Sequence, residues 1–120
     1  MSFLQVDQLP QQGRIGHAPT CLNDVGGAGA IAAVQMARLS GARVHFLTAL
    51  GRDEIGERSL KRLSELNVEA HVAWREQPTR QGISMVDPEG DRAITVIGAR
   101  LQPQANDPLP WDKLAACDGV

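Results

Sequence analysis

Hydrophobic and polar positions along the chain predict an α/β segment followed by an antiparallel ribbon. From Ala30 to Leu39 the chain combines alanines with long apolar side chains, which favours a helix that residues 40–41 end. Residues 43–50 form a nearly continuous apolar run, typical of a strand buried on both faces of a parallel sheet. A second, amphipathic helix should then run from Asp53, a suitable N-cap, to Asn67, which tolerates a left-handed conformation.

Beyond Asn67 apolar and polar residues alternate, in place of the helical spacing that precedes them. Residues 68–74 alternate, and two further short strands are expected at 82–86 and 93–97, joined by a turn at 87–91. We expect these three strands to form an antiparallel ribbon with one face free to cover a ligand.

The two ends of the chain are less regular. Residues 6–10 have the pattern of a strand end that runs into a loop, and residues 111–117 predict one or two helical turns after a proline-rich connector. The chain stops at 118–120, where a new strand is expected to start, so we interpret the chain as a piece of a longer protein.

Composition excludes several function classes. The 120 residues are 42% hydrophobic and 22% charged, which fits one globular domain. A net charge of -2, with only two Phe, two Trp and no Tyr, argues against nucleic-acid binding. No apolar run suits a membrane span, and the start does not resemble a signal peptide. We therefore expect a cytoplasmic protein in which Cys21 and Cys117 are buried, reduced thiols, with a single disulfide between them as the alternative.

A glycine-rich turn at residues 24–29 leads directly into the first helix. Gly26, Gly27 and Gly29 permit backbone conformations closed to other residues and leave no side chain between backbone and ligand. The first turn of a helix offers unpaired N–H groups and a partial positive charge, which can hold a hydroxyl, a phosphate or a carboxylate. The alternative is a structural turn packed tightly onto a helix.

These motifs, in their order, resemble the ribokinase/PfkB carbohydrate kinase family. The resemblance rests on Gly-Gly-Ala-Gly-Ala at 26–30, Gly-Arg-Asp-Glu-Ile-Gly at 51–56, Val-Asp at 86–87, Gly-Asp-Arg at 90–92 and Gly-Ala at 98–99. It covers nearly the whole chain and is similar to the N-terminal portion of the family, without its first strand and its C-terminal nucleotide-binding and catalytic half.

The resemblance implies a partial ribokinase-like α/β fold: a mostly parallel sheet with flanking helices and a small antiparallel β lid. The lid strands are expected at about 1–22 and 68–98, and the α/β part at about 23–67 and 99–120. It also implies that lid strands can join two copies into a homodimer.

The implied activity is transfer of the ATP γ-phosphoryl group to a hydroxyl of a sugar or sugar phosphate, with Mg²⁺. The family's "G-A-G-D" motif, which carries the catalytic base, has no counterpart here, because Gly29 is followed by Ala30. We therefore expect neither catalytic nor metal-binding residues in this chain, and no turnover by this chain alone.

Substrate-binding residues are carried over by position. On the resemblance, Gly26 and Gly27 lie against the sugar, and Ala28 and Ile31 occupy positions where many family members carry lysine and asparagine. Neither of these two side chains can hydrogen-bond a sugar.

Four further residues complete the predicted site or depart from the family pattern. Ile83 and Met85 are expected to close over the substrate from the lid, or else to be ordinary strand core. Asp24 is the acid that we expect to orient the glycine turn. Arg100 stands where the family commonly has asparagine.

Two other functions stay open. Gly27-x-Gly29-x-x-Ala32 fits a Rossmann dinucleotide-binding fingerprint, but residues 20–24 make a poor preceding strand and no acidic residue ends the next one. The second is a non-catalytic module that binds a sugar or a partner chain.

Histidines and helix charges predict no site of their own. His17, His45 and His71 are far apart in sequence, and His45 is expected to be a strand or core residue. The charged residues between 57 and 65 are expected to form only a solvated helix face.

Overall fold

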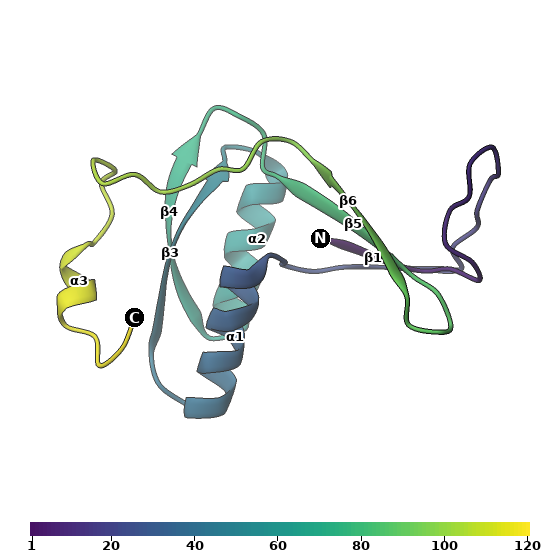
Figure 1. The fold of residues 1–120 in the computed structure, drawn as a ribbon. Helices are drawn as coiled ribbons and strands as arrows, with labels where there is room; N and C mark the ends of the chain where they lie inside the picture. Colours follow the sequence, from purple (N-terminus) through teal and green to yellow (C-terminus); the bar gives the residue numbers. More distant parts are fainter.

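A computed structural model describes all 120 residues, and it contains two sheets and three helices. The elements follow in the order β1 (Ser2–Gln5), β2 (Thr20–Asn23), α1 (Ala28–Ser40), β3 (Val44–Gly51), α2 (Glu54–Glu65), β4 (Val68–Arg75), β5 (Gln81–Val86), β6 (Arg92–Ile97) and α3 (Asp112–Ala115). Figure 1 shows that the two sheets occupy different halves of the molecule.

The α/β half is built on the parallel pair β3–β4, with Val44 opposite Val68 and Gly51 opposite Arg75. Helices α1 and α2 lie on one side of this pair, and the chain after β6, including α3, lies on the other (Figure 1). The buried cluster between the helices and the strands consists of Ala30, Ala33, Val34, Ala37, Val44, Leu63 and Val68. The small alanine side chains let α1 approach the strands closely.

The ends of both helices follow the predicted local chemistry. Gly41 ends α1 with a φ of 63°, and Asn67 takes the left-handed conformation with a φ of 61°. Asp53 caps α2, because its Oδ1 accepts a hydrogen bond of 2.8 Å from the Gly56 N–H. These three predictions are confirmed.

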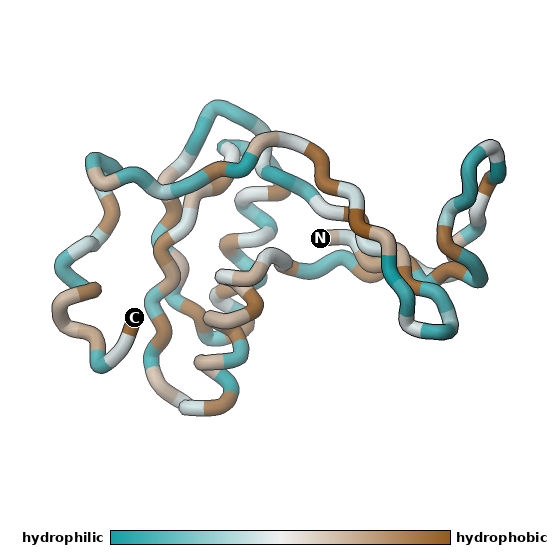
Figure 2. Tube along the Cα trace, viewed as in Figure 1, coloured by the Kyte–Doolittle hydropathy of each residue, from teal (hydrophilic) through white to brown (hydrophobic).

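The second sheet has the strand order β2-β1-β5-β6 and is antiparallel except between β1 and β5. It projects away from the helices (Figure 1), and Figure 2 shows that the turn between β5 and β6 at its far end is hydrophilic. This projection raises the radius of gyration to 16.5 Å, where about 14 Å is expected for a compact chain of this length.

One strand was assigned to the wrong sheet. Residues 68–74 were predicted in the antiparallel ribbon, but β4 pairs in parallel with β3 along its whole length. The alternation arises because one face of β4 packs on the helices while the other carries polar residues such as Glu69 and His71. A half-polar strand can therefore belong to a parallel pair.

Two further expectations fail. β2, the strand before the glycine turn, pairs antiparallel with β1 in the other sheet, whereas a dinucleotide-binding unit needs it parallel to the strands of the α/β sheet. The Rossmann alternative is therefore wrong. Cys21 and Cys117 are both exposed, free thiols rather than buried ones.

The connector that follows β6 is tied to the open face of β4. Arg75 binds Asp107 through two hydrogen bonds of 2.8 and 2.6 Å. The short helix α3 confirms the turns predicted at 111–117. No helix in the structure has both the length and the apolar character needed to cross a bilayer.

Candidate functional site

The glycine turn places an uncapped helix end at the junction of the two halves. Gly27, the N-cap of α1, has a φ of 90° and a ψ of 146°, and no side chain caps the helix. The first turn of α1 also contains no acidic residue. Because the first N–H groups of a helix have no partner within it, this end can donate hydrogen bonds to a ligand.

A cavity of about 490 Å³ lies at this helix end. One wall is the glycine turn from Val25 to Ala30, another is the end of β3, and a third is the segment from Thr79 to Gly82 that enters β5. Arg100 and Leu101, after β6, complete it. We call it the glycine-turn cavity. Its lining contains no carboxylate, and its polar side chains are Thr48, Ser59, Thr79, Arg80, Gln81 and Arg100.

The segment 79–82 is held at the cavity by the 51–56 motif. Asp53 accepts from the Thr79 hydroxyl at 2.7 Å through Oδ1 and from the Thr79 N–H at 2.7 Å through Oδ2. The Gly51 N–H donates to the Thr79 hydroxyl at 2.9 Å. The hydrogen bonds that Asp53 itself accepts, those from Thr79 first, lower the pKa of Asp53 below its ordinary value.

The glycines of this motif are needed for close packing. A Cβ on Gly51 would collide with the backbone of residues 77–79, and a Cβ on Gly56 would collide with the Gly51 carbonyl oxygen. The motif therefore joins the end of β3, the start of α2 and the approach to β5 into one rigid corner. Its role in this structure is to position a wall of the cavity.

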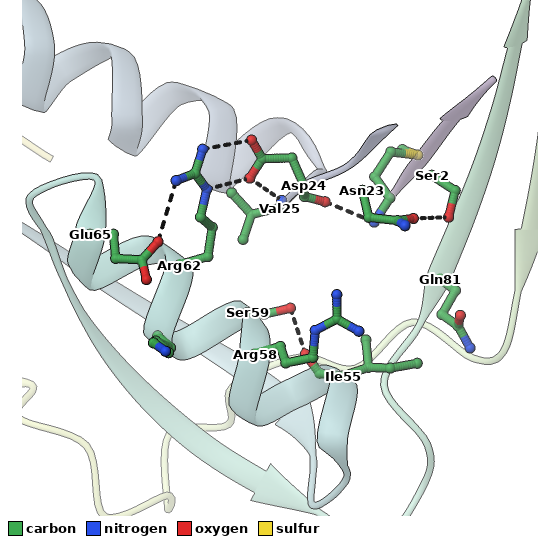
Figure 3. A pocket seen from close by; sticks show the side chains of 12 residues that line it. Ser2, Asn23, Asp24, Val25, Ile55, Arg58, Ser59, Arg62, Glu65 and Gln81 are labelled. Carbon is green, nitrogen blue, oxygen red and sulfur yellow. Dashed lines mark hydrogen bonds and ion pairs between the residues drawn. The ribbon is translucent and has the colours of Figure 1, made fainter. Parts of the chain in front are cut away.

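A second, charged cavity of about 390 Å³ adjoins the first, and the two share Met1, Val25, Ile55, Ser59 and Gln81. Figure 3 shows Asp24 and Arg62 joined directly at one side of it, with Glu65 on the other side of the guanidinium. Arg58 and Lys61 also line this charged cavity.

Asp24 is fixed by Arg62, which bridges the glycine turn to α2. The Arg62 Nε and a terminal nitrogen donate to the two oxygens of Asp24 at 2.9 and 3.0 Å. Asp24 Oδ1 also accepts from the Val25 N–H at 2.8 Å. The hydrogen bonds from Arg62 are the main reason why the pKa of Asp24 lies below its ordinary value. The expectation that the charges of α2 form only a solvated face is therefore wrong for Arg62.

The structure brings only some of the predicted site residues together. Gly26, Gly27 and Ala28 line the glycine-turn cavity, and Asp24 lines the charged cavity beside it. Ile31, Ile83 and Met85 line neither cavity, and Ile31 is largely exposed on α1.

Several lining residues were not predicted. Thr48, Arg80 and Gln81 reach the glycine-turn cavity from the end of β3 and the start of β5. Their positions depend on the pairing of distant strands, so no local sequence signal marks them. The sequence marks Arg100 only as a departure from the family pattern, whereas the structure places it at the cavity.

Met1 packs inside the junction between the two halves. A Cβ on Gly26 would lie 2.5 Å from the Met1 Cβ, and one on Gly82 would lie 2.7 Å from the Met1 Sδ. Gly26 and Gly82 therefore allow the glycine turn and β5 to pack against the Met1 side chain from two directions.

Comparisons with known proteins show the family and the fold of the chain. The chain matches the pfkB family carbohydrate kinase over residues 3–118. None of the curated proteins compared with it gives a match.

Among solved structures, a candidate ribokinase from Agrobacterium tumefaciens is 25% identical with a TM-score of 0.79, and the match covers 92% of this chain and 37% of that one. An Arabidopsis thaliana ribokinase in complex with ribose and ATP is 25% identical, with a TM-score of 0.58 and coverages of 82% and 33%. The phosphofructokinase-2 from Escherichia coli, in complex with fructose-6-phosphate, is 20% identical, with a TM-score of 0.72 and coverages of 88% and 34%.

The chain thus spans about a third of the length of each of these relatives. The family match extends over nearly all of its residues, and the α/β fold with its mixed sheets matches that of ribokinases. The chain therefore belongs to the pfkB family of carbohydrate kinases.

Proposed function

We propose that this chain is the sugar-binding part of an ATP-dependent carbohydrate kinase, which phosphorylates a hydroxyl of a sugar or sugar phosphate. The observation that carries the proposal is the uncapped N-terminus of α1, which opens on the glycine-turn cavity. A volume of about 490 Å³ lies within the range of small-molecule sites. The ribose and ATP bound by the Arabidopsis relative support the substrate class.

Each wall of the cavity has a defined part in this proposal. Gly26 and Gly27 let the sugar approach the backbone, and the first N–H groups of α1 donate to its hydroxyls. Arg80 and Gln81 supply side-chain donors from the opposite wall. Ala28 gives an apolar surface for a sugar face, in place of a polar ligand.

The second sheet acts as the lid in this proposal. Ile83 and Met85 lie on β5, the strand whose start forms one wall of the cavity. We infer that they reach the substrate only when the second sheet moves towards α1. A second copy that pairs with this sheet is a candidate partner.

The donor set of the cavity does not fit a resident Mg²⁺. Mg²⁺ prefers carboxylate and water oxygens, whereas the side chains here offer hydroxyl, amide and guanidinium groups and no carboxylate. Phosphoryl transfer also needs a positioned base. We assign no residue of this chain to the base, to ATP or to the metal.

The test uses two matched substitutions on the same helix in the complete protein. Ala28 lines the cavity, whereas Ala32 is exposed on α1 and lines neither cavity. Ala28→Leu should weaken ribose or fructose-6-phosphate binding by about tenfold or more, which is about 1.4 kcal/mol, because the larger side chain fills the sugar's place. Ala32→Leu should leave binding unchanged.

Affinities are measured by calorimetry, and phosphorylation by ADP release. Equal sugar affinities for the two variants would overturn the assignment of the cavity. Sugar binding without ADP release in the complete protein would favour a non-catalytic sugar-binding module instead.

Asp24 is tested separately. If it orients the glycine turn for the sugar, Asp24→Asn should lower sugar affinity, because an amide cannot pair with Arg62 as a carboxylate does. Unchanged sugar affinity in the complete protein would limit Asp24 to a structural role.

A further inference from the structure

Two histidines and a glutamate meet on the face of β3–β4 that points away from α1 and α2. Val44 and Val68 face the helices, and strand side chains alternate between faces, so His45, Glu69 and His71 point the other way. The parallel register sets His45 opposite Glu69 and His71 opposite Leu47. This pairing unites histidines that are 26 residues apart, and the expectation that the histidines stay separate is wrong for these two.

The candidate ligand atoms of the three side chains, one from each residue, all lie within 4.8 Å of one another. His45 Nδ1 lies 3.1 Å from His71 Nε2. The two oxygens of Glu69 lie 3.5 Å from His45 Nδ1 and 3.6 Å from His71 Nε2. A tetrahedral Zn²⁺ with bonds of about 2.0–2.1 Å holds neighbouring donor atoms about 3.3 Å apart. The observed nitrogen–nitrogen distance of 3.1 Å is slightly below this separation, and the two nitrogen–oxygen distances of 3.5 and 3.6 Å are slightly above it.

A hydrogen bond between the rings does not account for the carboxylate that lies beside both of them. An N–H···N bond between neutral imidazoles accounts for the 3.1 Å separation, but it leaves the Glu69 carboxylate facing both nitrogens without a hydrogen bond to either. A cation among the three groups satisfies all of them. Two imidazoles and one carboxylate are also the donor set of a known class of zinc sites.

The surroundings suit a bound ion with access from solvent. The side chains of His45 and His71 are 14% and 18% exposed, so both rings are held by packing, while Glu69 is 48% exposed and leaves an open side. We propose that His45, Glu69 and His71 form a site for Zn²⁺ or a similar divalent transition metal, with water as the fourth ligand.

This site is separate from the proposed sugar site. Phe46 and Thr48, which line the glycine-turn cavity, project from the opposite face of β3 to His45. Imidazole donors favour zinc, copper, iron or nickel over Mg²⁺, so the site does not serve the Mg²⁺ that accompanies ATP. A bound ion would instead link β3 to β4 and stabilise the folded state.

The test is a metal titration of the full chain with Cys21→Ser and Cys117→Ser, because both exposed thiols are competing ligands. Co²⁺ is added to metal-free protein and followed by its visible absorption, and Zn²⁺ affinity is then obtained by displacement. Three variants, His45→Gln, His71→Gln and Glu69→Gln, each remove one proposed ligand. His17→Gln removes an exposed loop histidine and is the matched control.

We expect one Co²⁺ per chain, displaced by Zn²⁺ but not by Mg²⁺, and a thermal midpoint that rises with Zn²⁺. Loss of a residue that only hydrogen-bonds a metal ligand commonly weakens metal binding about 10–100-fold. Loss of a ligand itself should therefore weaken metal binding by at least about 100-fold. His17→Gln should bind as the parent does. Glu69→Gln keeps the size of a half-exposed side chain, so it tests the site without disturbing the core.

Absence of a one-to-one complex would overturn the proposal and leave a hydrogen-bonded histidine pair. Binding that survives all three ligand substitutions, or that His17→Gln abolishes, would also overturn it. Neither result bears on sugar binding, so the metal site and the proposed kinase function fail separately.

Discussion

Asp53 binds Thr79 through both of its carboxylate oxygens, one to the hydroxyl and one to the backbone N–H, each at 2.7 Å. The same Asp53 caps α2, and the same Thr79 accepts from the Gly51 N–H. The pair therefore links a strand end, a helix start and the segment that forms a wall of the glycine-turn cavity. Asp53, predicted from the sequence as a helix cap, thus also acts as a structural lock.

Thr79→Val should break this lock. Valine keeps the shape but removes the hydroxyl, which leaves the buried Gly51 N–H without its acceptor. We expect the free energy of unfolding to fall by about 1–3 kcal/mol, the usual effect of an unsatisfied buried group. Urea denaturation measures it. Thr20→Val, at an exposed threonine of β2, should change stability by less than about 0.5 kcal/mol. Similar losses for both variants would contradict the lock.

Gly56→Ala should destabilise the protein although glycine to alanine normally stabilises a helix by about 1 kcal/mol. The added Cβ would collide with the Gly51 carbonyl oxygen and touch the Thr79 hydroxyl and the Trp74 ring. Overpacking of this kind typically lowers stability by about 1–3 kcal/mol. Gly16→Ala is the control, because nothing lies within 4 Å of its new Cβ. A Gly56→Ala variant that is more stable than the parent would contradict the prediction. It would show that the end of β3, the start of α2 and the approach to β5 can move apart to accommodate the added Cβ.

Local chemistry predicted the helix ends correctly because each depends on a few adjacent residues. Asp53 as a cap, Asn67 in the left-handed region and Gly41 at the end of α1 needed no tertiary information. The glycine turn was also found at the cavity, since Gly26, Gly27 and Ala28 line it.

Non-local pairing was not predictable in the same way. β1 is only four residues long, and its parallel partner β5 begins some 80 residues later, so no local pattern reveals the pair. Asp24 and Arg62 are 38 residues apart, and only the packing of α2 beside the glycine turn brings them together. The alternating pattern of β4 predicted a strand correctly but placed it in the wrong sheet. Polar residues along one face of a strand occur both in antiparallel ribbons and in parallel pairs, so the pattern does not distinguish the two.

Acid should weaken the fold through its paired carboxylates. The pKa values of Asp24, Asp53 and Asp107 are all below their ordinary value of 3.8. Each group therefore contributes stability that is complete above the unfolded pKa and is lost as the pH falls through the lower folded pKa. We expect the free energy of unfolding to fall steadily below about pH 4.

Asp24→Asn separates one of these contributions. The stability difference between the parent and this variant should be constant near neutral pH and shrink below about pH 4, where Asp24 of the parent becomes protonated. Asp7→Asn, at an exposed loop position, is the control and should give no such trend. Denaturant unfolding at several pH values measures both differences. A difference for Asp24→Asn that does not change with pH would show that Arg62 does not hold the carboxylate as the structure indicates.

Asp107→Asn should release the connector from the open face of β4. Asp107 accepts two hydrogen bonds from Arg75 and one of 2.6 Å from the Gln104 N–H, so it fixes both the position of the connector and its local turn. An amide can supply only one acceptor oxygen, and it loses the charge that strengthens the bonds to a guanidinium. We expect faster amide exchange at Gln104 and several-fold faster tryptic cleavage after Arg100. Asp112→Asn, at an exposed position of α3, should leave both rates unchanged.

Because Arg100 also lines the glycine-turn cavity, the release of the connector in Asp107→Asn should lower sugar affinity as well. An unchanged affinity beside faster cleavage would mean that Arg100 contributes nothing to the ligand and that the connector serves only to cover the sheet.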